Sequence, residues 1–307
     1  MSPRRVLVTG GSGRFGRFVV ADVMRVAEVS VFDRVPPPAD IPHVIGDVRD
    51  LAALERAVRG HYAVIHLAGL DSGVSASEHD YFHVNVQGTF NALAAAEAAG
   101  IGRVVACSSI AAYGLEPLPP RRRPDYLPFD EDHPLRPDVA YDLSKSVVEE
   151  VAAAFARKTG MVVPCLRPAW IIFPGREADF DRRCREADGG GPLPDGHRPP
   201  PPHRAYVRPD DAAAAFRLAL DAPLEGAEPL NIGADDTMSP APTLDVMART
   251  FGPGIAVRAA EAFEEPRAAA FSNARARASL AWSPTGTWHD FVAEPPGDPF
   301  APEETRR

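Results

Sequence analysis

The sequence predicts an α/β fold, a doubly wound parallel sheet with helices on both faces. Two observations predict it. Over the first half of the 307-residue chain, short apolar runs alternate with stretches of helical periodicity, which is typical of a parallel sheet. A glycine-rich turn at residues 9–16 joins the first such run to the first helix. With 45% hydrophobic and 24% charged residues, the chain can bury a sizeable core.

The composition narrows the class of partner. A net charge of −9 argues against nucleic acid and anionic membranes as partners. No apolar run has the length of a membrane span. The three cysteines, Cys107, Cys165 and Cys184, have no Cys-x-x-Cys spacing, so we expect reduced thiols in a cytoplasmic protein and no metal site.

The first strand, at residues 6–8, runs into glycines at positions 10, 13 and 16 and then a helix to about residue 26. A tight turn, a backbone that approaches a pyrophosphate and a closely packed helix each require glycine. The free N–H groups at the helix start can bind phosphates. An ordinary turn in a glycine-rich chain is the alternative. The dinucleotide interpretation assigns this loop five cofactor residues: Gly10, Gly13, Arg14, Phe15 and Gly16.

An acidic residue ends the second predicted strand, at residues 29–32. The Asp33 carboxylate can accept hydrogen bonds from both adenosine ribose hydroxyls, and it would repel a 2′-phosphate. Asp33 therefore favours NAD over NADP, although Arg34 beside it weakens that preference. A simple strand-end turn is the other interpretation of Asp33.

Two further strands complete this half of the expected nucleotide site. Residues 43–45 predict the third strand, and Asp47 and Val48 follow it, where Asp47 either reaches the adenine amino group or ends a turn. After a helix at residues 50–59, the fourth strand at 62–69 ends in residues that let a dinucleotide lie against the backbone: Leu67, Ala68 and Gly69. His66 in that strand is expected to be a core histidine.

A long helix is predicted over residues 77–99, with Asn85 and Gly88 in its interior. Both residues have low helix propensity, which indicates close packing or a local hydrogen bond. The fifth strand, residues 103–107, leads into Ser108 and Ser109 at the sheet edge where parallel sheets bind ligands.

Tyr141 and Lys145 stand at the start of a helix predicted over residues 140–158. A spacing of four places them on one helix face, one turn apart. The ammonium favours the phenolate, so we expect it to lower the pKa of Tyr141 and make the phenol an acid or base near neutral pH. The alternative is an exposed helix that carries Tyr and Lys by chance.

The second half of the chain has a weaker pattern. A strand is expected at residues 162–166, and residues 174–204 predict one long mobile loop because they are rich in Gly, Pro and Arg. Further loops are expected at the proline clusters 36–38, 117–120 and 199–202. Helices are expected near residues 210–220, 243–251 and 273–280, with a strand at 230–232 and an unstructured tail after Pro295.

The glycine loop, Asp33, Ser109 and the pair Tyr141/Lys145 together resemble the short-chain dehydrogenase/reductase superfamily. The Gly-x-x-Gly-x-x-Gly spacing is similar to that of its extended branch, the NAD-dependent epimerase/dehydratase family, and the resemblance runs from about residue 4 to 282. It implies a Rossmann-type sheet with a smaller C-terminal substrate lobe. The implied parts are a dinucleotide-binding domain at 1–168, a substrate-binding lobe at 169–294 that interleaves with the core, and a flexible tail at 295–307.

The resemblance also implies roles for individual residues. Ser109 would be the catalytic serine, Tyr141 the acid/base, and Lys145 would hold the nicotinamide ribose. Leu166-Arg167-Pro168 resembles the segment beside the nicotinamide, which adds Pro168 to the cofactor residues. Asp210 and Asp211 resemble a motif that packs the lobe onto the core. The expected substrate residues are Ser72, Ser109, Tyr113 and Trp170.

Two departures from the family pattern narrow the expected reaction. Ile110 and Ala111 occupy the positions where dehydratases carry an Asp-Glu pair, so dehydration is not expected. Trp170 stands where many nucleotide-sugar epimerases carry Asn. The size and the C-terminal end of the chain resemble the uronate dehydrogenase-like group.

We therefore expect an NAD-dependent oxidoreductase that acts on a secondary alcohol or ketone of a small sugar-like or polar molecule. An NAD-dependent sugar epimerase is the alternative among enzymes, and a non-catalytic NAD(H)-binding protein is the alternative of another class. The resemblance further implies a homodimer that pairs the helix near 77–99 and the Tyr141 helix of each subunit.

Overall fold

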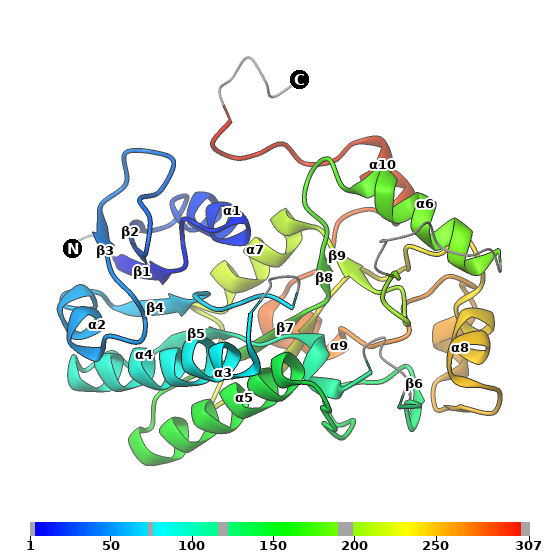
Figure 1. The fold of residues 1–307 in the computed structure, drawn as a ribbon, viewed down its shortest axis with the longest axis horizontal. Coiled ribbons are helices and arrows are strands. Elements are labelled where there is room, and N and C mark those ends of the chain that lie inside the picture. The colour runs from blue at the N-terminus through cyan, green and yellow to red at the C-terminus, as the bar shows by residue number, and fades with distance from the viewer. Residues whose placement is uncertain (1–3, 73–75, 116–121, 190–198, 302–307) are drawn as a thin grey trace.

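A computed structural model describes residues 4–72, 76–115, 122–189 and 199–301 of the chain. Its centre is a seven-stranded, wholly parallel sheet with helices on both faces, so the predicted Rossmann-like α/β class is confirmed (Figure 1). Across the sheet the strands are β10 (Pro229–Ile232), β7 (Cys165–Pro168), β5 (Val104–Cys107), β4 (Ala63–His66), β1 (Arg5–Thr9), β2 (Glu28–Asp33) and β3 (His43–Ile45).

Alternate residues of the strands face two separate cores. Val6 and Val8 of β1 belong to one buried cluster, and Leu7 between them belongs to the other. This follows from the two-residue period of a strand, and an apolar run without polar interruptions is what a sheet covered on both sides requires. The chain passes β1-β2-β3 in one direction and then returns through β4, β5 and β7, so the direction of winding switches between β1 and β4.

The two faces carry different helices. The first cluster packs under α1 (Arg14–Val23) and α7 (Pro209–Leu218), which contact each other. The second packs against α2 (Leu51–Ala57), α4 (Gln87–Ala98) and α5 (Ala140–Thr159). Figure 1 shows α1 and α7 on one side of the sheet and α2, α4 and α5 on the other.

The predicted helix over residues 77–99 contains a π-helical turn. It consists of α3 (Glu78–Tyr81), the π-helical segment Phe82–Val86 and α4. Asn85 lies in the π turn, where its amide bonds both backbone groups of Leu70, at 2.7 and 3.2 Å. At Gly88 a Cβ would lie 2.7 Å from a methyl group of Val48. Asn85 therefore makes the expected local hydrogen bond, and Gly88 the expected close packing.

His66 at the end of β4 is the core histidine that the sequence predicted. Its Nδ1 lies 2.8 Å from the Thr9 hydroxyl, and the residue is 3% exposed. Burial lowers the pKa of His66 to about 3, with a further contribution from the charge of Lys145. The ring is therefore neutral at physiological pH.

The second half of the chain adds to the same sheet. The predicted helices are present as α7, α8 (Thr243–Phe251) and α9 (Ala274–Leu280), and the predicted strand is β10. β7 begins at Cys165 instead of at residue 162, because Val162 makes only an isolated bridge to Arg103. The short elements β6 (Tyr126–Leu127), β8 (Trp170–Ile171), β9 (Tyr206–Val207), β11 (Ala256–Val257) and α10 (Trp288–Ala293) were not predicted.

The prediction of a loop throughout residues 174–204 is wrong, because α6 (Glu177–Asp188) lies within it. Ion pairs one turn apart support this helix, with Asp179–Arg182 at 2.6 Å and Asp181–Arg185 at 2.7 Å. Phe180 adds a buried contact on its inner face. Residues 190–198 of the predicted loop, the proline cluster 117–120 and residues 302–307 of the tail lie outside the described residues; residues 295–301 carry no helix or strand.

The lobe-packing motif makes structural contacts. The Asp211 carboxylate accepts hydrogen bonds from the backbone N–H and the hydroxyl of Thr285, both at 2.9 Å, and its backbone carbonyl accepts from the Trp282 indole. These contacts join α7 to the segment after α9, as expected for Asp211. Within the part of the chain that the structure describes, no helix combines the length and apolar character needed to cross a membrane.

Candidate active site

A cavity of about 1120 Å³ lies at the carboxyl ends of the central strands, beside the switch between β1 and β4. This is the place where open parallel sheets bind ligands. The cavity wall includes every residue of the predicted cofactor set: Gly10, Gly13, Arg14, Phe15, Gly16, Asp33, Arg34, Asp47, Val48, Leu67, Ala68, Gly69, Lys145 and Pro168.

The glycine loop forms a cradle that side chains would fill. Gly10 has φ +73°, and a Cβ on it would lie 2.7 Å from the Ala68 backbone nitrogen. A Cβ on Gly16 would overlap the Gly10 carbonyl. Helix α1 begins beyond Gly13 with no side-chain cap and no acidic residue in its first turn. Its free N–H groups and positive dipole end suit a pyrophosphate, so these residues fit a dinucleotide.

The two acidic residues of the cofactor half have different surroundings. The Asp33 carboxylate at the end of β2 is oriented by the N–H groups of Ser12, at 3.0 Å, and Arg34, at 2.6 Å. Asp47 instead forms a bidentate pair with the Arg49 guanidinium, at 2.9 and 2.6 Å, and these bonds lower the pKa of Asp47. Asp33 is thus held at the cavity edge by main-chain donors, and Asp47 is partly engaged by Arg49.

The fold brings the three predicted catalytic residues together from β5 and α5. The Tyr141 phenol and the Ser109 hydroxyl line the same cavity, close enough for Ser109 to lower the pKa of the phenol. The Lys145 ammonium lies 5.8 Å from the centre of the Tyr141 ring and donates to the Cys107 carbonyl at 3.0 Å. Ser109 also accepts from the Ala111 N–H, at 3.1 Å, which fixes the hydroxyl at the end of β5.

The expectation that the pKa of Tyr141 is lowered toward neutral pH is wrong for this arrangement. The pKa of Tyr141 is raised well above its usual range, chiefly by burial and then by the negative charge of Asp71. The nearby Ser109 hydroxyl lowers the pKa of Tyr141 by a smaller amount. Since the phenol is removed from water, it is held in its protonated form.

A second polar contact supports the helix that carries Tyr141. The Ser144 hydroxyl donates to the Tyr141 carbonyl at 2.7 Å and accepts from the Asn85 amide at 3.0 Å. Asn85 also holds the backbone of Leu70, beyond β4. The π turn therefore ties the start of α5 to the loop after β4.

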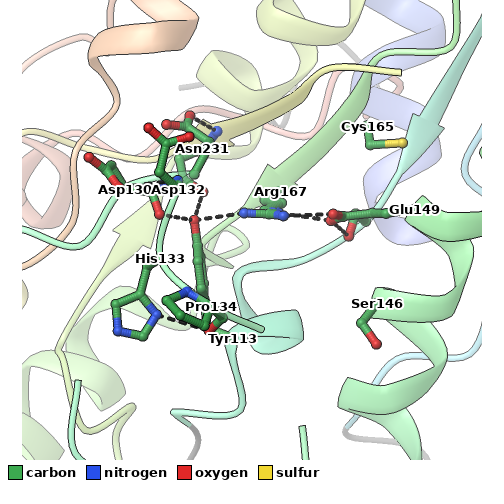
Figure 2. A network of polar contacts seen from close by, with 12 residues as sticks. Tyr113, Asp130, Asp132, His133, Pro134, Ser146, Glu149, Cys165, Arg167 and Asn231 are labelled. Atoms are coloured by element: carbon green, nitrogen blue, oxygen red, sulfur yellow. Dashed lines mark hydrogen bonds and ion pairs between the residues drawn. The ribbon is translucent and has the colours of Figure 1, made fainter. Parts of the chain in front are cut away.

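Tyr113 does not belong to the cavity wall, so its predicted role as a substrate residue is wrong. The side chain is 1% exposed. Its hydroxyl accepts from the Arg167 guanidinium at 2.8 Å and lies 2.8 Å from the Asp130 carbonyl and 2.9 Å from Asn231 Oδ1 (Figure 2). The 3-10 helix at Ile110–Tyr113 turns the ring away from the strand edge and into the core.

The other predicted substrate residues, Ser72 and Trp170, line the cavity with Ser109. Trp170 packs against the Phe180 ring of α6, with ring centres 5.7 Å apart. Sequence reasoning missed several residues of this wall: Asp71, Tyr81, Arg122, Asp138, Phe173, Arg176, Phe180 and Arg183. The helical period of α6 was the available signal for Phe180 and Arg183, which lie one turn apart.

Charged side chains of both signs meet at the mouth of the cavity. Arg122 and Asp138 form a bidentate ion pair at 2.8 and 2.7 Å. Arg14 lies over the Phe173 ring, at 4.9 Å, and 3.7 Å from Asp71. Among the described residues, no cluster of His, Cys, Asp and Glu side chains is placed to hold a metal ion.

The sequence profile of the NAD dependent epimerase/dehydratase family matches residues 6–233. The chain belongs to this family. This is the family that the sequence motifs resembled. The family and the relatives of this chain are enzymes of the short-chain dehydrogenase/reductase type.

Members of the epimerase/dehydratase family and its superfamily resemble the chain at moderate identity. Short-chain dehydrogenase/reductase family 42E member 1 of Danio rerio is 31% identical over 230 residues, which are 70% of this chain and 58% of that protein. The chain thus spans less than two thirds of that relative. UDP-glucose 4-epimerase of Corynebacterium glutamicum is 27% identical over 313 residues, 92% of each chain. A short-chain dehydrogenase/reductase superfamily protein from Agrobacterium tumefaciens, crystallised with bound NAD, is 27% identical with a TM-score of 0.72 and covers 94% of this chain and 95% of its own.

Proposed function

We propose that the protein is an NAD-dependent oxidoreductase that acts on a secondary alcohol or ketone of a small sugar-like or polar substrate. The observation that carries the proposal is the placement of Ser109, Tyr141 and Lys145 in the same cavity as the glycine cradle. A buried phenol with a strongly shifted pKa in a ligand cavity is typical of an acid/base residue.

The residues in the cofactor half of the cavity would each bind a different part of NAD. The N-terminus of α1 and the glycine cradle would hold the pyrophosphate, Asp33 the adenosine ribose, and Lys145 the nicotinamide ribose. NAD fits better than NADP, because the Asp33 carboxylate would repel a 2′-phosphate. When bound, the nicotinamide supplies the hydride chemistry of the reaction.

Two side chains of the protein, Tyr141 and Ser109, would act on the substrate oxygen and its proton. Tyr141 donates its phenolic proton to the oxygen of a ketone during reduction and takes the hydroxyl proton during oxidation. Ser109 hydrogen-bonds the same oxygen and orients it. Since burial keeps Tyr141 protonated, the phenol is matched to proton donation. Oxidation requires the phenolate, so its rate should rise with pH.

The substrate half suits a small molecule with hydroxyl groups. Trp170, Phe173 and Phe180 offer flat apolar faces, while the Arg122/Asp138 pair offers charged hydrogen-bonding groups. At about 1120 Å³ the cavity slightly exceeds the usual upper volume of a single small-molecule site, about 1,000 Å³, so a dinucleotide and a substrate can share it.

An NAD-dependent sugar epimerase is the second candidate, favoured by the similarity to a UDP-glucose 4-epimerase over 92% of the chain. It would use the same Tyr141 and Ser109, with a transient ketone and a retained cofactor.

One assay separates these functions. The purified chain would be incubated with NAD⁺ and, in turn, a uronic acid, an aldose and UDP-glucose, with NADH absorbance and sugar composition both followed. Net NADH supports the dehydrogenase. Interconversion of sugars without net NADH supports the epimerase, and bound NAD without either reaction supports a non-catalytic binder.

We also propose that the protein is located in the cytoplasm and that its substrate lobe lies within residues 169–294. We further propose a homodimer that pairs the helix near residues 77–99 and α5 of each subunit. Phe90 on α4 and Leu143 on α5 are 50% and 40% exposed, which supports an apolar contact between subunits. Light scattering gives the mass: a monomer would argue against the dimer.

A further inference from the structure

Glu149 lies on the face of α5 that carries the proposed catalytic residues. It follows Lys145 by one helical turn and Tyr141 by two, so the three side chains lie in a row. Its side chain is 12% exposed, and the Arg167 side chain that it contacts is 3% exposed. Glu149 is therefore a nearly buried carboxylate one helical turn beyond the site residue Lys145.

The Glu149 carboxylate contacts two segments beside the site, through Ser108 and Arg167. Oε1 accepts from the Ser108 hydroxyl at 2.5 Å and from Arg167 Nε at 2.8 Å, and Oε2 accepts from an Arg167 terminal nitrogen at 2.6 Å. Ser108 immediately precedes Ser109, and Arg167 immediately precedes Pro168. One carboxylate thus contacts the neighbour of a site residue both just after β5 and on β7.

Arg167 is itself held on its far side. Its other terminal nitrogen donates to the Tyr113 hydroxyl at 2.8 Å, and Tyr113 is fixed by Asn231 of β10 (Figure 2). The guanidinium therefore cannot follow Glu149 if α5 shifts. A buried ion pair adds little stability compared with apolar packing, but its geometry is strict.

We propose that Glu149 is a positioning residue, whose carboxylate sets the register of α5 against the ends of β5 and β7 and so brings Tyr141 to Ser109. This inference rests on the proposed function, in which those two hydroxyls act on one substrate oxygen. A misplacement of about 1 Å at such a contact can lower turnover about 100-fold.

A positioning role for Glu149 predicts that its loss changes the pKa of Tyr141, whereas a purely structural ion pair predicts no such change. Ser109 lowers the pKa of Tyr141, so a greater separation of the two hydroxyls should raise that pKa further. The other groups that face the phenol come from four segments and are not changed by the test: Asp71 after β4, Tyr81 of α3, Cys107 of β5, and Asp142 and Lys145 of α5.

The experiment reads the Tyr141 phenol directly and needs no substrate. The full chain with NAD⁺ would be prepared with 3-fluorotyrosine at its six tyrosines, and the ¹⁹F signal of Tyr141 assigned by Tyr141→Phe. Glu149→Gln keeps the side-chain shape and removes the charge. Glu150→Gln, on the exposed side of the same helix, is the matched control.

We expect Glu149→Gln to move the Tyr141 signal and to raise its titration midpoint, with Glu150→Gln unchanged. If Glu149→Gln does not fold, Ser108→Ala decides the question, because it leaves the ion pair intact and should give a smaller shift in the same direction. A Tyr141 signal and midpoint equal to wild type in the folded variant would overturn the inference.

A measurement of turnover distinguishes failure of the positioning role from failure of the proposed reaction. If wild type oxidises a substrate of the assay above, Glu149→Gln should lower kcat about 10-fold with KM for NAD⁺ nearly unchanged. A moved Tyr141 signal in a protein without any turnover would leave the positioning role in place and remove the oxidoreductase.

Discussion

The Lys145 ammonium donates a hydrogen bond to the Cys107 carbonyl at 3.0 Å, which joins the Tyr141 helix to the end of β5. The contact crosses from the face of α5 to the strand edge that carries Ser109. It places a positive charge beside the phenol while one of the three ammonium protons is engaged by the protein. The remaining protons are available to a ribose.

Tyr141→Phe should lower turnover by about 10² to 10⁴-fold, because the ring is kept and the acid/base hydroxyl is lost. NAD binding should change little. The measurement is kcat with the substrate found in the panel, beside NADH binding followed by fluorescence. Tyr62→Phe, at a distant half-buried position, is the control. Equal turnover in Tyr141→Phe and wild type would contradict the acid/base role.

Lys145→Met should weaken NAD binding by about 10-fold or more, because a charged donor to the ribose is lost, and it should also lower kcat. Lysine occurs at only one other position, Lys158, which is exposed and paired with Glu97. Lys158→Met is therefore a close control for the loss of one positive charge. Isothermal titration with NAD⁺ gives both affinities, and the same affinity in the two variants would remove Lys145 from the cofactor site.

Asp33→Ser should shift cofactor preference toward NADP⁺ by about 10-fold or more, because the carboxylate that repels a 2′-phosphate is removed while Arg34 remains. The quantity to compare is the ratio of kcat/KM for NAD⁺ and NADP⁺. Asp47→Ser, at the other acidic position, should leave that ratio nearly unchanged. A ratio that moves for Asp47 and not for Asp33 would reverse the assignment.

Asp211 predicts a pH dependence of stability. Burial raises the pKa of Asp211 from 3.8 to about 6, so the folded state binds this proton more tightly than the unfolded chain. The unfolding free energy should therefore gain from Asp211 as the pH falls from about 6 toward 4, by up to about 3 kcal/mol, and lose that gain as the pH rises through 6.

Urea unfolding at several pH values tests the Asp211 prediction. Asp211→Asn cannot titrate and should lose this part of the pH dependence. Asp210→Asn, at the neighbouring residue that pairs with Arg208, should keep it. Parallel stability curves for Asp211→Asn and wild type between pH 4 and 7 would show that Asp211 is not the group responsible.

Sequence patterns predicted the first half of the sheet well. The strands at β1, β2 and β3 follow from apolar runs of a few residues, and the glycine loop follows from steric needs that only glycine meets, as at Gly10. Local signals suffice there, because each element is specified by its own residues.

Other features required contacts between distant segments. Strands β8 and β9 have two residues each, too few for a period, and exist because they pair with each other. Helix α6 was not predicted, because the residues around it are rich in Gly, Pro and Arg and indicated a loop. Tyr113 matched a family motif, yet the 3-10 helix that ends with it directs its hydroxyl to Arg167.

The sequence by itself determined the parallel α/β class, the glycine cradle, and the presence of a serine, a tyrosine and a lysine suited to proton transfer. Tertiary structure alone decided that Tyr141 meets Ser109, that Tyr113 faces the core, and that the pKa of Tyr141 is raised. The physical reason is that spacing along a helix is a local property, whereas burial and the desolvation of a phenol depend on every element that closes around it.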